Sequence, residues 1–408
     1  MTKEELKKIA KEAEKLAAGR FEHLEEISEY NTEKVLNAFR QHRVSEAMFA
    51  GSTGYGYDDL GRDTLDKIWA DVFGTESALV RLGFVNGTHA ITCALFAPLR
   101  CGDVLLFATG LPYDTLWAAI GLHDEKPGSL RSYGVEFQVT ELLPDGTPDY
   151  EAIREAAKNP RVKEVFFQRS RGYTARPALS VSMLNRGIDA VHSVNPAAAC
   201  VVDNCYGEFT EREEPKADLM AGSLIKNPGG GLAPMGGYIA GRAELVEAAA
   251  FRLTVPGIGG EVGASLGFNR SLYQGLFVAP HVVCQALKTA VFSAALLEKL
   301  GYESFPAWDT ERSDIIQSID FHDADKLCRF CTGIQQASPV DSYVTPEPWD
   351  MPGYEAPVIM AAGTFIQGSS IELSCDGPML PPYRAYLQGG ITYEAGKLGI
   401  ISAVERLL

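Results

Sequence analysis

Two segments decide how this chain folds: residues 197–203, Ala-Ala-Ala-Cys-Val-Val-Asp, and residues 221–231, Ala-Gly-Ser-Leu-Ile-Lys-Asn-Pro-Gly-Gly-Gly. The first is an apolar strand pattern that ends in the carboxylate of Asp203. The second places Lys226 at the end of an apolar run, and Asn227-Pro228 cannot continue a helix or a central strand. The three glycines that follow allow the backbone to pack closely against another segment. A strand-end aspartate and, 23 residues later, a lysine on a glycine-rich turn indicate an imine-forming lysine with a pyridinium partner.

Outward from these segments, short apolar runs alternate with helical stretches. The predicted strands cover residues 78–82, 104–107, 135–139, 165–167, 200–202 and 238–240. The predicted helices between them cover residues 88–99, 114–120, 150–157, 182–191 and 243–251. This alternation predicts an α/β fold with a mostly parallel central sheet and helices on both faces. Such sheets bind ligands at the carboxyl ends of their strands, where Asp203 lies.

The rest of the chain predicts a helical N-terminal arm and a smaller α+β C-terminal domain. Near the N-terminus we expect helices over 3–18, over 31–41 with Asn31 as N-cap, and over 63–73. After a glycine-rich joint at 254–263 we expect helices over 280–299, 324–336 and 393–407, and strands near 316–321 and 371–374. The glycines of the joint do not fit the dinucleotide-binding pattern G-x-G-x-x-G, because Val262 occupies the last position. The predicted domains are therefore an arm and loop (1–60), a large cofactor-binding domain (61–255) and a small domain (256–408).

Composition excludes several classes of partner. The 408 residues carry a net charge of −16, which argues against nucleic acid or an anionic membrane as the main partner. The first residues are charged, and no run of 18 apolar residues occurs, so we expect neither a signal peptide nor a membrane span. The eight cysteines are scattered, which is typical of reduced thiols in the cytoplasm. Cys328 and Cys331 have CxxC spacing but lack a second ligand pair, so no metal site is predicted.

Pyridoxal 5'-phosphate (PLP) requires a set of groups that this chain offers in strand-to-helix turns. Lys226 would form the imine, and burial near other cations would lower its pKa so that the free amine can act as a base. Asp203 would keep the ring nitrogen protonated, and Tyr113 would stack on the ring and act as an acid. The predicted phosphate ligands open a helix or lie near the lysine: Asn86, Gly87, Thr88 and Ser223.

Each of these residues also has an ordinary interpretation. A lysine before Asn-Pro is most often a surface turn residue, Gly-Thr at a helix start is usually a cap, and an aspartate after a strand is often an N-cap. Their joint occurrence in the order phosphate loop, aromatic residue, aspartate and Ser-x-x-Lys favours the cofactor site. A phosphate-binding protein without PLP ranks lowest, because the chain lacks G-x-x-x-x-G-K-[ST].

Longer sequence motifs of this chain resemble those of a known protein family. They include Gly54-Tyr-Gly-Tyr-Asp-Asp-Leu-Gly-Arg62, Gln168-Arg-Ser-Arg-Gly-Tyr173 and Val202-Asp-Asn-Cys-Tyr-Gly-Glu-Phe209. Others lie at residues 78–81, 87–91, 110–115, 223–231, 367–374 and 388–390, so they extend over nearly the whole chain. The chain resembles the methionine gamma-lyase-like proteins, also called the aluminium-resistance family, which are PLP-dependent, fold-type I relatives of cystathionine beta-lyase.

The resemblance implies more than the residues alone. It implies a homotetramer, a dimer of dimers, with active sites at the dimer interface, where Tyr57 and Arg62 would reach the phosphate of the neighbouring subunit. Two positions depart from the family pattern: Asn86 replaces a serine, and Leu380 replaces an arginine before Pro381-Pro-Tyr383. That arginine would be a natural partner for the substrate carboxylate. The substitutes offered by this chain are Arg384, Arg171 and Arg169.

The predicted function is a cytoplasmic PLP-dependent carbon–sulfur lyase that removes a thiol from the β or γ carbon of a sulfur-containing amino acid. Another PLP reaction on the same fold, such as γ-replacement, transamination or aldol cleavage, stays open because small changes in the pocket direct the chemistry of the cofactor. A PLP-binding stress protein with weak catalysis also stays open, and Leu380 favours it modestly. A transcriptional role ranks low, because no DNA-binding helix pair or basic patch occurs.

Overall fold

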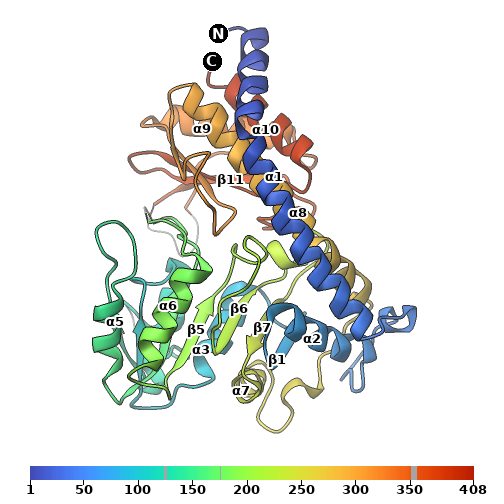
Figure 1. Cartoon of the computed structure of the whole chain (residues 1–408), viewed down its shortest axis with the longest axis vertical. Coiled ribbons are helices and arrows are strands. Elements are labelled where there is room, and N and C mark those ends of the chain that lie inside the picture. The colour runs from blue at the N-terminus through green and yellow to red at the C-terminus, as the bar shows by residue number, and fades with distance from the viewer. Residues whose placement is uncertain (124–125, 175, 351–355) are drawn as a thin grey trace.

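The computed structural model describes residues 1–123, 126–174, 176–350 and 356–408. It contains two β-sheets, which lie at opposite ends of the molecule and are joined along one side by two long helices (Figure 1). All strands of the first sheet lie between Ser77 and Gly241, and all strands of the second lie between Glu303 and Gln388. We call these parts the large and the small domain.

The large domain is built on a seven-stranded sheet in which one strand runs against the others. Its strand order is β1-β7-β6-β5-β4-β2-β3, and only β7 pairs antiparallel with its neighbours. The mostly parallel sheet predicted from the alternating pattern is therefore confirmed. The strands are β1 (Ser77–Arg81), β2 (Val104–Phe107), β3 (Glu136–Val139), β4 (Val162–Gln168), β5 (Ala199–Asp203), β6 (Leu219–Ser223) and β7 (Gly237–Gly241).

Helices cover both faces of this sheet, as predicted. Buried side chains of α2 (Leu60–Phe73), α5 (Tyr150–Ala157) and α6 (Val181–His192) form one core layer with the sheet. Those of α3 (Gly87–Phe96), α4 (Trp117–Ile120) and α7 (Ala243–Leu253) form the layer on the opposite face. The strands β2, β5, β6 and β7 are buried at every position, because helices cover both of their faces, whereas the edge strand β3 exposes Glu136 and Gln138. Short 3-10 turns occur at Glu46–Phe49, Asp114–Leu116, Arg131–Tyr133, Asn227–Gly229 and Gly259–Glu261.

The small domain has a five-stranded sheet in the order β10-β11-β12-β9-β8, and all of its pairings are antiparallel. Its strands are β8 (Glu303–Phe305), β9 (Gln317–Asp320), β10 (Val358–Ala361), β11 (Ser374–Pro378) and β12 (Arg384–Gln388). Side chains alternate across the sheet, so Ile319, Cys375 and Leu387 join the core with α9 (Ala324–Ala337) and α10 (Tyr393–Glu405). The predicted strand at 371–374 is misplaced, since the strand begins at Ser374.

One long helix, α1 (Lys3–Gln41), replaces the two helices predicted near the N-terminus. Asn31 is not an N-cap: it is fully buried within α1, and its side-chain amide donates to the carbonyl oxygens of Ile27 and Glu211. Thr32 likewise donates its hydroxyl to the carbonyl of Ser28, one turn back. Polar residues that favour caps were thus accommodated inside a helix by bonds to the preceding turn.

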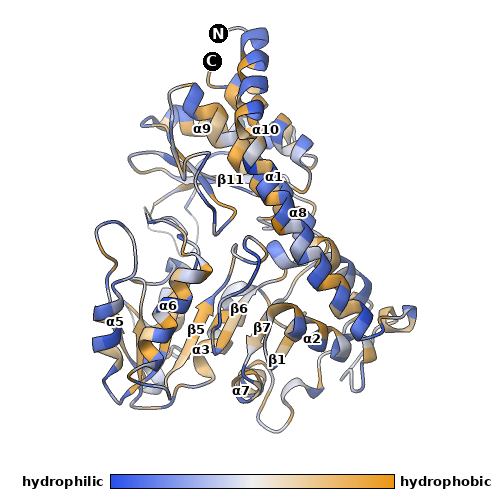
Figure 2. Ribbon diagram, in the orientation of Figure 1, coloured by the Kyte–Doolittle hydropathy of each residue, from blue (hydrophilic) through white to orange (hydrophobic). Residues whose placement is uncertain are grey.

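The helix α8 (Asn269–Lys299) runs beside α1 and forms the longest contact between any two helices of the described chain. By length and composition alone this helix could cross a membrane, but 72% of its most apolar stretch of 18 residues is buried inside the protein. Figure 2 shows the same arrangement by hydropathy, with hydrophobic colour on the central strands and hydrophilic residues along the outer side of α1. The helix α8 is therefore a core helix that connects the two domains.

Candidate functional site

A cavity of about 190 Å³ lies at the carboxyl ends of β4, β5 and β6 and also receives residues from the small domain. This is the edge of the sheet where parallel α/β proteins bind ligands. The predicted residues that line it come from four separate turns of the large domain: Asn86, Gly87, Thr88, Tyr113, Asp203, Ser223 and Lys226.

Lys226 is held by the turn that follows β6. Asn227 is fully buried, and its side chain donates to the carbonyl oxygens of Tyr206 and Glu208, which ties the turn to the segment after β5. The glycines allow the close packing that the sequence predicted, since a Cβ on Gly229 would lie 1.7 Å from the carbonyl oxygen of Leu224. The Lys226 amine consequently lies 3.8 Å from the centre of the Tyr206 ring, inside the cavity.

The electrostatic surroundings of Lys226 differ from the prediction. Burial lowers the pKa of Lys226, but the acidic groups of Cys205, Tyr206 and Asp203 raise it, and the net pKa lies above the ordinary lysine value. The expected lowering of the pKa by nearby cations is therefore wrong for the chain by itself, because the neighbours of the amine are acidic.

Asp203 ends β5 at the base of the cavity. Burial raises the pKa of its carboxyl group, while Lys226 and the backbone N–H of Cys205 lower it, and the net pKa is raised. That N–H donates to Asp203 Oδ1 over 3.1 Å, which fixes the direction of the carboxylate. The group is nine-tenths buried and has the position required of a partner for a cationic ligand atom.

The start of α3 forms a cradle opposite Lys226. The Asn86 side chain caps the helix by accepting from the N–H of His89, and the first-turn residues Gly87 and Thr88, whose N–H groups have no partner within the helix, line the cavity. A Cβ on Gly87 would lie 3.1 Å from the Cβ of Ser223, so glycine is what allows the two turns to meet. The hydroxyl groups of Thr88 and Ser223 add donors, and a helix start with such donors suits an anion.

Tyr113 is positioned by Gln168, whose side-chain oxygen accepts from the Tyr113 backbone N–H over 2.6 Å. Its ring meets the ring of Tyr173 edge to face at 6.4 Å. Both Tyr113 and Gln168 line the cavity, and a second cavity of about 460 Å³ adjoins it through the same two residues and Tyr173.

Several residues of the cavity were not predicted as site residues. Gln168 and Tyr173 lie in a family motif from which only Arg169 and Arg171 were proposed as site residues. The small domain contributes Asp376, Tyr386 and Gln388. The signal available in the sequence was the alternation of β11 and β12, which places these three side chains on the face away from the α9 core.

The arginines proposed for a carboxylate have different surroundings. Arg384 makes a bidentate ion pair with Asp320, which lies opposite it on β9, and it lines neither cavity. Arg169 is fully buried and paired with Glu211 and Glu214. Arg171 lines the second cavity, where its Nε and Nη1 atoms have no hydrogen-bond partner among the described residues. Its Nη2 donates to the carbonyl oxygen of Phe305 over 2.7 Å, so, of the three arginines, Arg171 is the one that lines a cavity and has donors left over.

The loop expected to reach a neighbouring subunit divides into an exposed and a buried part. The Tyr57 ring is exposed, while Arg62 is buried. Arg62 donates to the carbonyl oxygens of Gly56, Gly263 and Glu261, so its guanidinium braces the loop from within its own chain. Binding of a neighbour's phosphate by these two residues stays a prediction.

Residues 6–408 match the family model described as methionine gamma-lyase. The chain belongs to the methionine gamma-lyase family. The predicted resemblance is thereby confirmed over nearly the whole chain.

This family member is similar in sequence or in structure to several known proteins. An uncharacterized protein, YnbB, of Bacillus subtilis (strain 168) is 54% identical over 407 residues, which cover 99% of this chain and 96% of that protein. The crystal structure of a carbon-sulfur lyase involved in aluminium resistance from Clostridium novyi is 50% identical, with a TM-score of 0.96 over 99% of this chain and 96% of that one. The PLP-dependent protein YhfS of Escherichia coli shares the fold at 16% identity, with a TM-score of 0.62 and coverage of 94% and 97%. The chain therefore has the fold-type I architecture.

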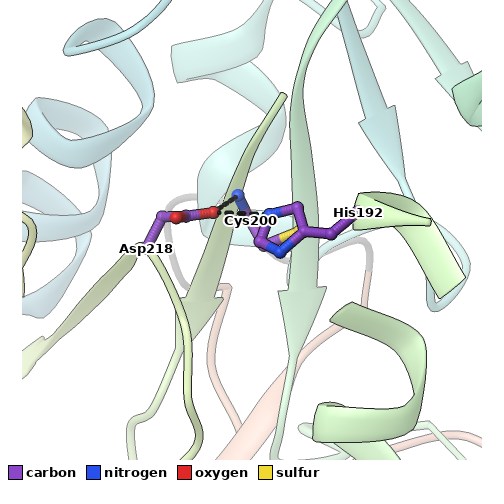
Figure 3. Close-up of side chains that lie close together, drawn as sticks. All are labelled: His192, Cys200 and Asp218. Carbon is purple, nitrogen blue, oxygen red and sulfur yellow. Dashed lines mark hydrogen bonds and ion pairs between the residues drawn. The ribbon is translucent and has the colours of Figure 1, made fainter. Parts of the chain in front are cut away.

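A second group of polar side chains in this methionine gamma-lyase family member lies at the opposite end of the sheet. His192, Cys200 and Asp218 are close together at the end of α6 and the starts of β5 and β6 (Figure 3). Asp218 Oδ2 accepts from the Cys200 backbone N–H over 2.7 Å and lies 3.0 Å from His192 Nε2. Arg242 lies 3.4 Å from the other oxygen of Asp218. Donors and a cation thus already surround the carboxylate, which favours a structural clasp over a metal site.

We expect this clasp to make folding stability depend on pH. The hydrogen bond to Asp218 raises the pKa of His192 in the folded protein. The pair of charged His192 with Asp218 therefore adds its full contribution to the free energy of unfolding below about pH 6.5, the pKa of histidine in the unfolded chain. That contribution is lost as pH rises through the higher pKa of the folded protein. His192→Gln should therefore lower the free energy of unfolding, by at most about 1 kcal/mol, mainly at pH 6 and below. Urea unfolding at pH 6 and pH 9 measures this, and an equal loss at both values would contradict the charge pair.

Proposed function

We propose that this chain binds PLP and is a carbon–sulfur lyase that acts on a sulfur-containing amino acid. The observation that carries the proposal is the convergence of Lys226, Asp203, Ser223 and the start of α3 on one cavity. The Clostridium novyi relative is named as a carbon-sulfur lyase, which supports the same reaction.

The residues present fit PLP. The N–H groups of Gly87 and Thr88 and the hydroxyl of Ser223 would hold the phosphate, and the close approach of Gly87 to Ser223 gives this cradle its shape. Asp203 would hold the proton on the ring nitrogen, because a buried carboxylate favours a cation beside it. Tyr113 would lie against the ring, fixed in place by Gln168.

The cofactor supplies the electron sink that makes the α-proton of an amino acid acidic. Lys226 would then take that proton on Nζ. When Asp203 is paired with a protonated ring nitrogen, one of the acidic groups that raise the pKa of Lys226 is neutralised. The pKa of Lys226 is then lower, so a larger fraction of the amine is unprotonated and able to accept a proton at neutral pH. Tyr113 would supply the acid for the departing sulfur, and the buried walls of the cavity would exclude water from the reacting carbon.

A PLP-binding protein with weak catalysis is the second candidate, and one observation favours it. The family arginine before Pro381 is Leu380 here, and Arg384 is already paired with Asp320. Visible absorption of the purified protein with and without added PLP, followed by assays for keto acid and thiol with cystathionine, methionine and cysteine, tests both candidates. A colourless protein that takes up no PLP would refute both, and bound PLP without keto acid would favour the second.

We expect Arg171 rather than Arg384 to bind the substrate carboxylate. Arg171→Met removes two unpaired donors from the cavity wall and should raise the KM by about 10–100-fold, the usual value of charge-assisted hydrogen bonds. Arg384→Met breaks the pair with Asp320 and should lower thermal stability while changing the KM less than about threefold. Steady-state kinetics of both variants show which arginine binds the carboxylate. A larger rise in the KM for Arg384→Met than for Arg171→Met would assign that role to Arg384.

We also propose a cytoplasmic homo-oligomer, a tetramer formed as a dimer of dimers. Exposed large apolar side chains lie on the loop before α2, on the first residue of α2, and on the joint before α8, which hydrogen-bonds to that loop: Tyr55, Tyr57, Leu60, Leu266 and Phe268. Exposed apolar side chains that lie together support a subunit contact. Light scattering of the purified protein measures the assembly, and Tyr57→Ser with Leu266→Ser should shift it towards monomer.

A further inference from the structure

The Lys226 amine lies against the face of an aromatic ring rather than against a carboxylate. Its Nζ atom is 3.8 Å from the centre of the Tyr206 ring, and the next shortest contact between a cation and a ring in the described chain measures 4.1 Å. Among the described residues, no carboxylate oxygen lies within 4.0 Å of this amine. Since both side chains line the candidate cavity, the ring acts directly on the charge of the amine that faces the cavity.

The backbone fixes Tyr206 beside Lys226. Asn227, the residue after the lysine, donates from its side-chain amide to the Tyr206 carbonyl oxygen over 2.9 Å. Tyr206 itself has a φ of 70°, in the left-handed region that a residue with a large side chain rarely adopts. Strain of this kind persists only where the surrounding structure imposes it, and it is found most often at functional sites. The strained segment after β5 therefore holds the ring in place against the amine.

The other titratable groups around the amine are acids, and the carboxylates among them have hydrogen-bond donors of their own. Asp203 accepts from the Cys205 backbone N–H, Glu208 accepts from the Tyr238 hydroxyl over 2.9 Å, and Asp376, which lines the cavity from the small domain, accepts from the Tyr173 hydroxyl. The remaining two are the Cys205 thiol and the phenol of Tyr113 on the cavity wall. The Tyr206 ring is thus the group that contacts the amine itself.

A ring face and a carboxylate affect an ammonium group in different ways. The ring attracts the positive charge through its quadrupole, and this attraction is stronger where water is excluded. A carboxylate would also accept a hydrogen bond and so hold one N–H in a fixed direction. Above the ring, the ammonium group is stabilised while its N–H bonds stay free to turn towards the substrate.

We propose that Tyr206 is a positioning residue that stabilises Lys226 in its ammonium form once the lysine has taken a proton from the substrate. In that step the α C–H bond breaks, an N–H bond forms at Nζ, and the electron pair stays with the substrate and the electron sink bound to it. The ammonium form is then the species that the ring favours, so the ring makes the lysine a stronger base. This role rests on the proposed lyase function.

The first test needs neither the cofactor nor turnover. Full-length protein freed of PLP is treated with acetic anhydride at pH 8, and acetylation of Lys226 is followed by mass spectrometry of the peptide that carries it. Only the unprotonated amine reacts, so a lower pKa of Lys226 appears as faster acetylation. Tyr206→Leu and Tyr206→Met remove the ring, whereas Tyr206→Phe keeps it. Tyr173→Leu is the matched control, because it opens the same cavity at a ring that meets the rings of Tyr113 and Tyr386.

Acetylation of Lys226 should be about 3–30-fold faster in both ringless variants than in the wild type, and within about twofold of the wild type in Tyr206→Phe. Equal rates in the wild type and the ringless variants would overturn the inference. An equal acceleration in Tyr173→Leu would overturn it too, because access of the reagent would then be the cause. Melting temperatures establish that each variant is folded, and if one ringless variant unfolds, the other makes the comparison.

The second test measures turnover of cystathionine by the PLP-loaded protein. The ringless variants should have a kcat about 3–10-fold lower than the wild type and a KM within about threefold, since the ammonium form arises only as the proton is transferred. Tyr206→Phe should keep the kcat of the wild type, and a wild-type kcat in the ringless variants would contradict the role in the reaction. A protein that takes up no PLP refutes the proposed function and this role with it, and the acetylation rates then still show whether the ring holds the ammonium form.

Discussion

Lys226→Ala should lower the release of keto acid from a thioether amino acid by about 10⁴-fold or more. The reason is that one amine serves both as the covalent anchor and as the base, and groups that act as a unit lose most of their effect when one is removed. Borohydride reduction followed by mass spectrometry of the denatured chain should show added cofactor on the wild type and none on the variant.

Lys216→Ala is the matched control, because Lys216 is an exposed lysine outside the cavity. It should keep both the added mass and the activity. Retention of the cofactor on denatured Lys226→Ala would show that another lysine forms the link, and the assignment of the site would fail.

Asp203→Asn should lower kcat by about 10²–10³-fold while PLP stays bound. An amide cannot hold a proton on the ring nitrogen as a carboxylate does, so stabilisation of the developing negative charge is lost, whereas the phosphate cradle at α3 is untouched. Steady-state kinetics and cofactor content measured on the same preparation separate the two effects.

Asp218→Asn provides the comparison for this second substitution. Asp218 lies just before the adjacent strand, β6, but at the far end of the sheet, where it is bound to His192. Its loss should affect stability and leave kcat within about threefold of the wild type. A kcat of Asp203→Asn equal to that of the wild type would mean that the ring nitrogen is not held by this carboxylate.

The main features of the large domain could be predicted because they are local in the sequence. Lys226 and Asp203 each follow an apolar run, and Gly87 opens a helix, so strand-to-helix turns alone placed them at one edge of a parallel sheet. The length of α1 could not be predicted from the same signals, since Asn31 and Thr32 favour a cap in isolation and are stabilised inside the helix only by bonds to the preceding turn.

The substrate side of the site could not be predicted for a different reason. Asp376, Tyr386 and Gln388 reach the cavity only because the small-domain sheet packs against the large domain. The sequence also could not show that Arg384 is already paired with Asp320, because that contact depends on the register of β12 with β9. Which charged side chains are available to a ligand is a property of tertiary packing.

The packing of α1 against segments that come much later in the sequence also determines when α1 can be buried during synthesis. Leu6, Ala10 and Ala13 pack into the core formed by α8 and the small domain, and Lys3 pairs with Glu405 over 2.8 Å. Because α1 precedes these partners in the sequence, it leaves the ribosome with an apolar stripe before the segments that cover the stripe have been translated. The stripe therefore stays without its folded partners until α8 and the small domain have been made, and a chain truncated before α8 would leave it exposed.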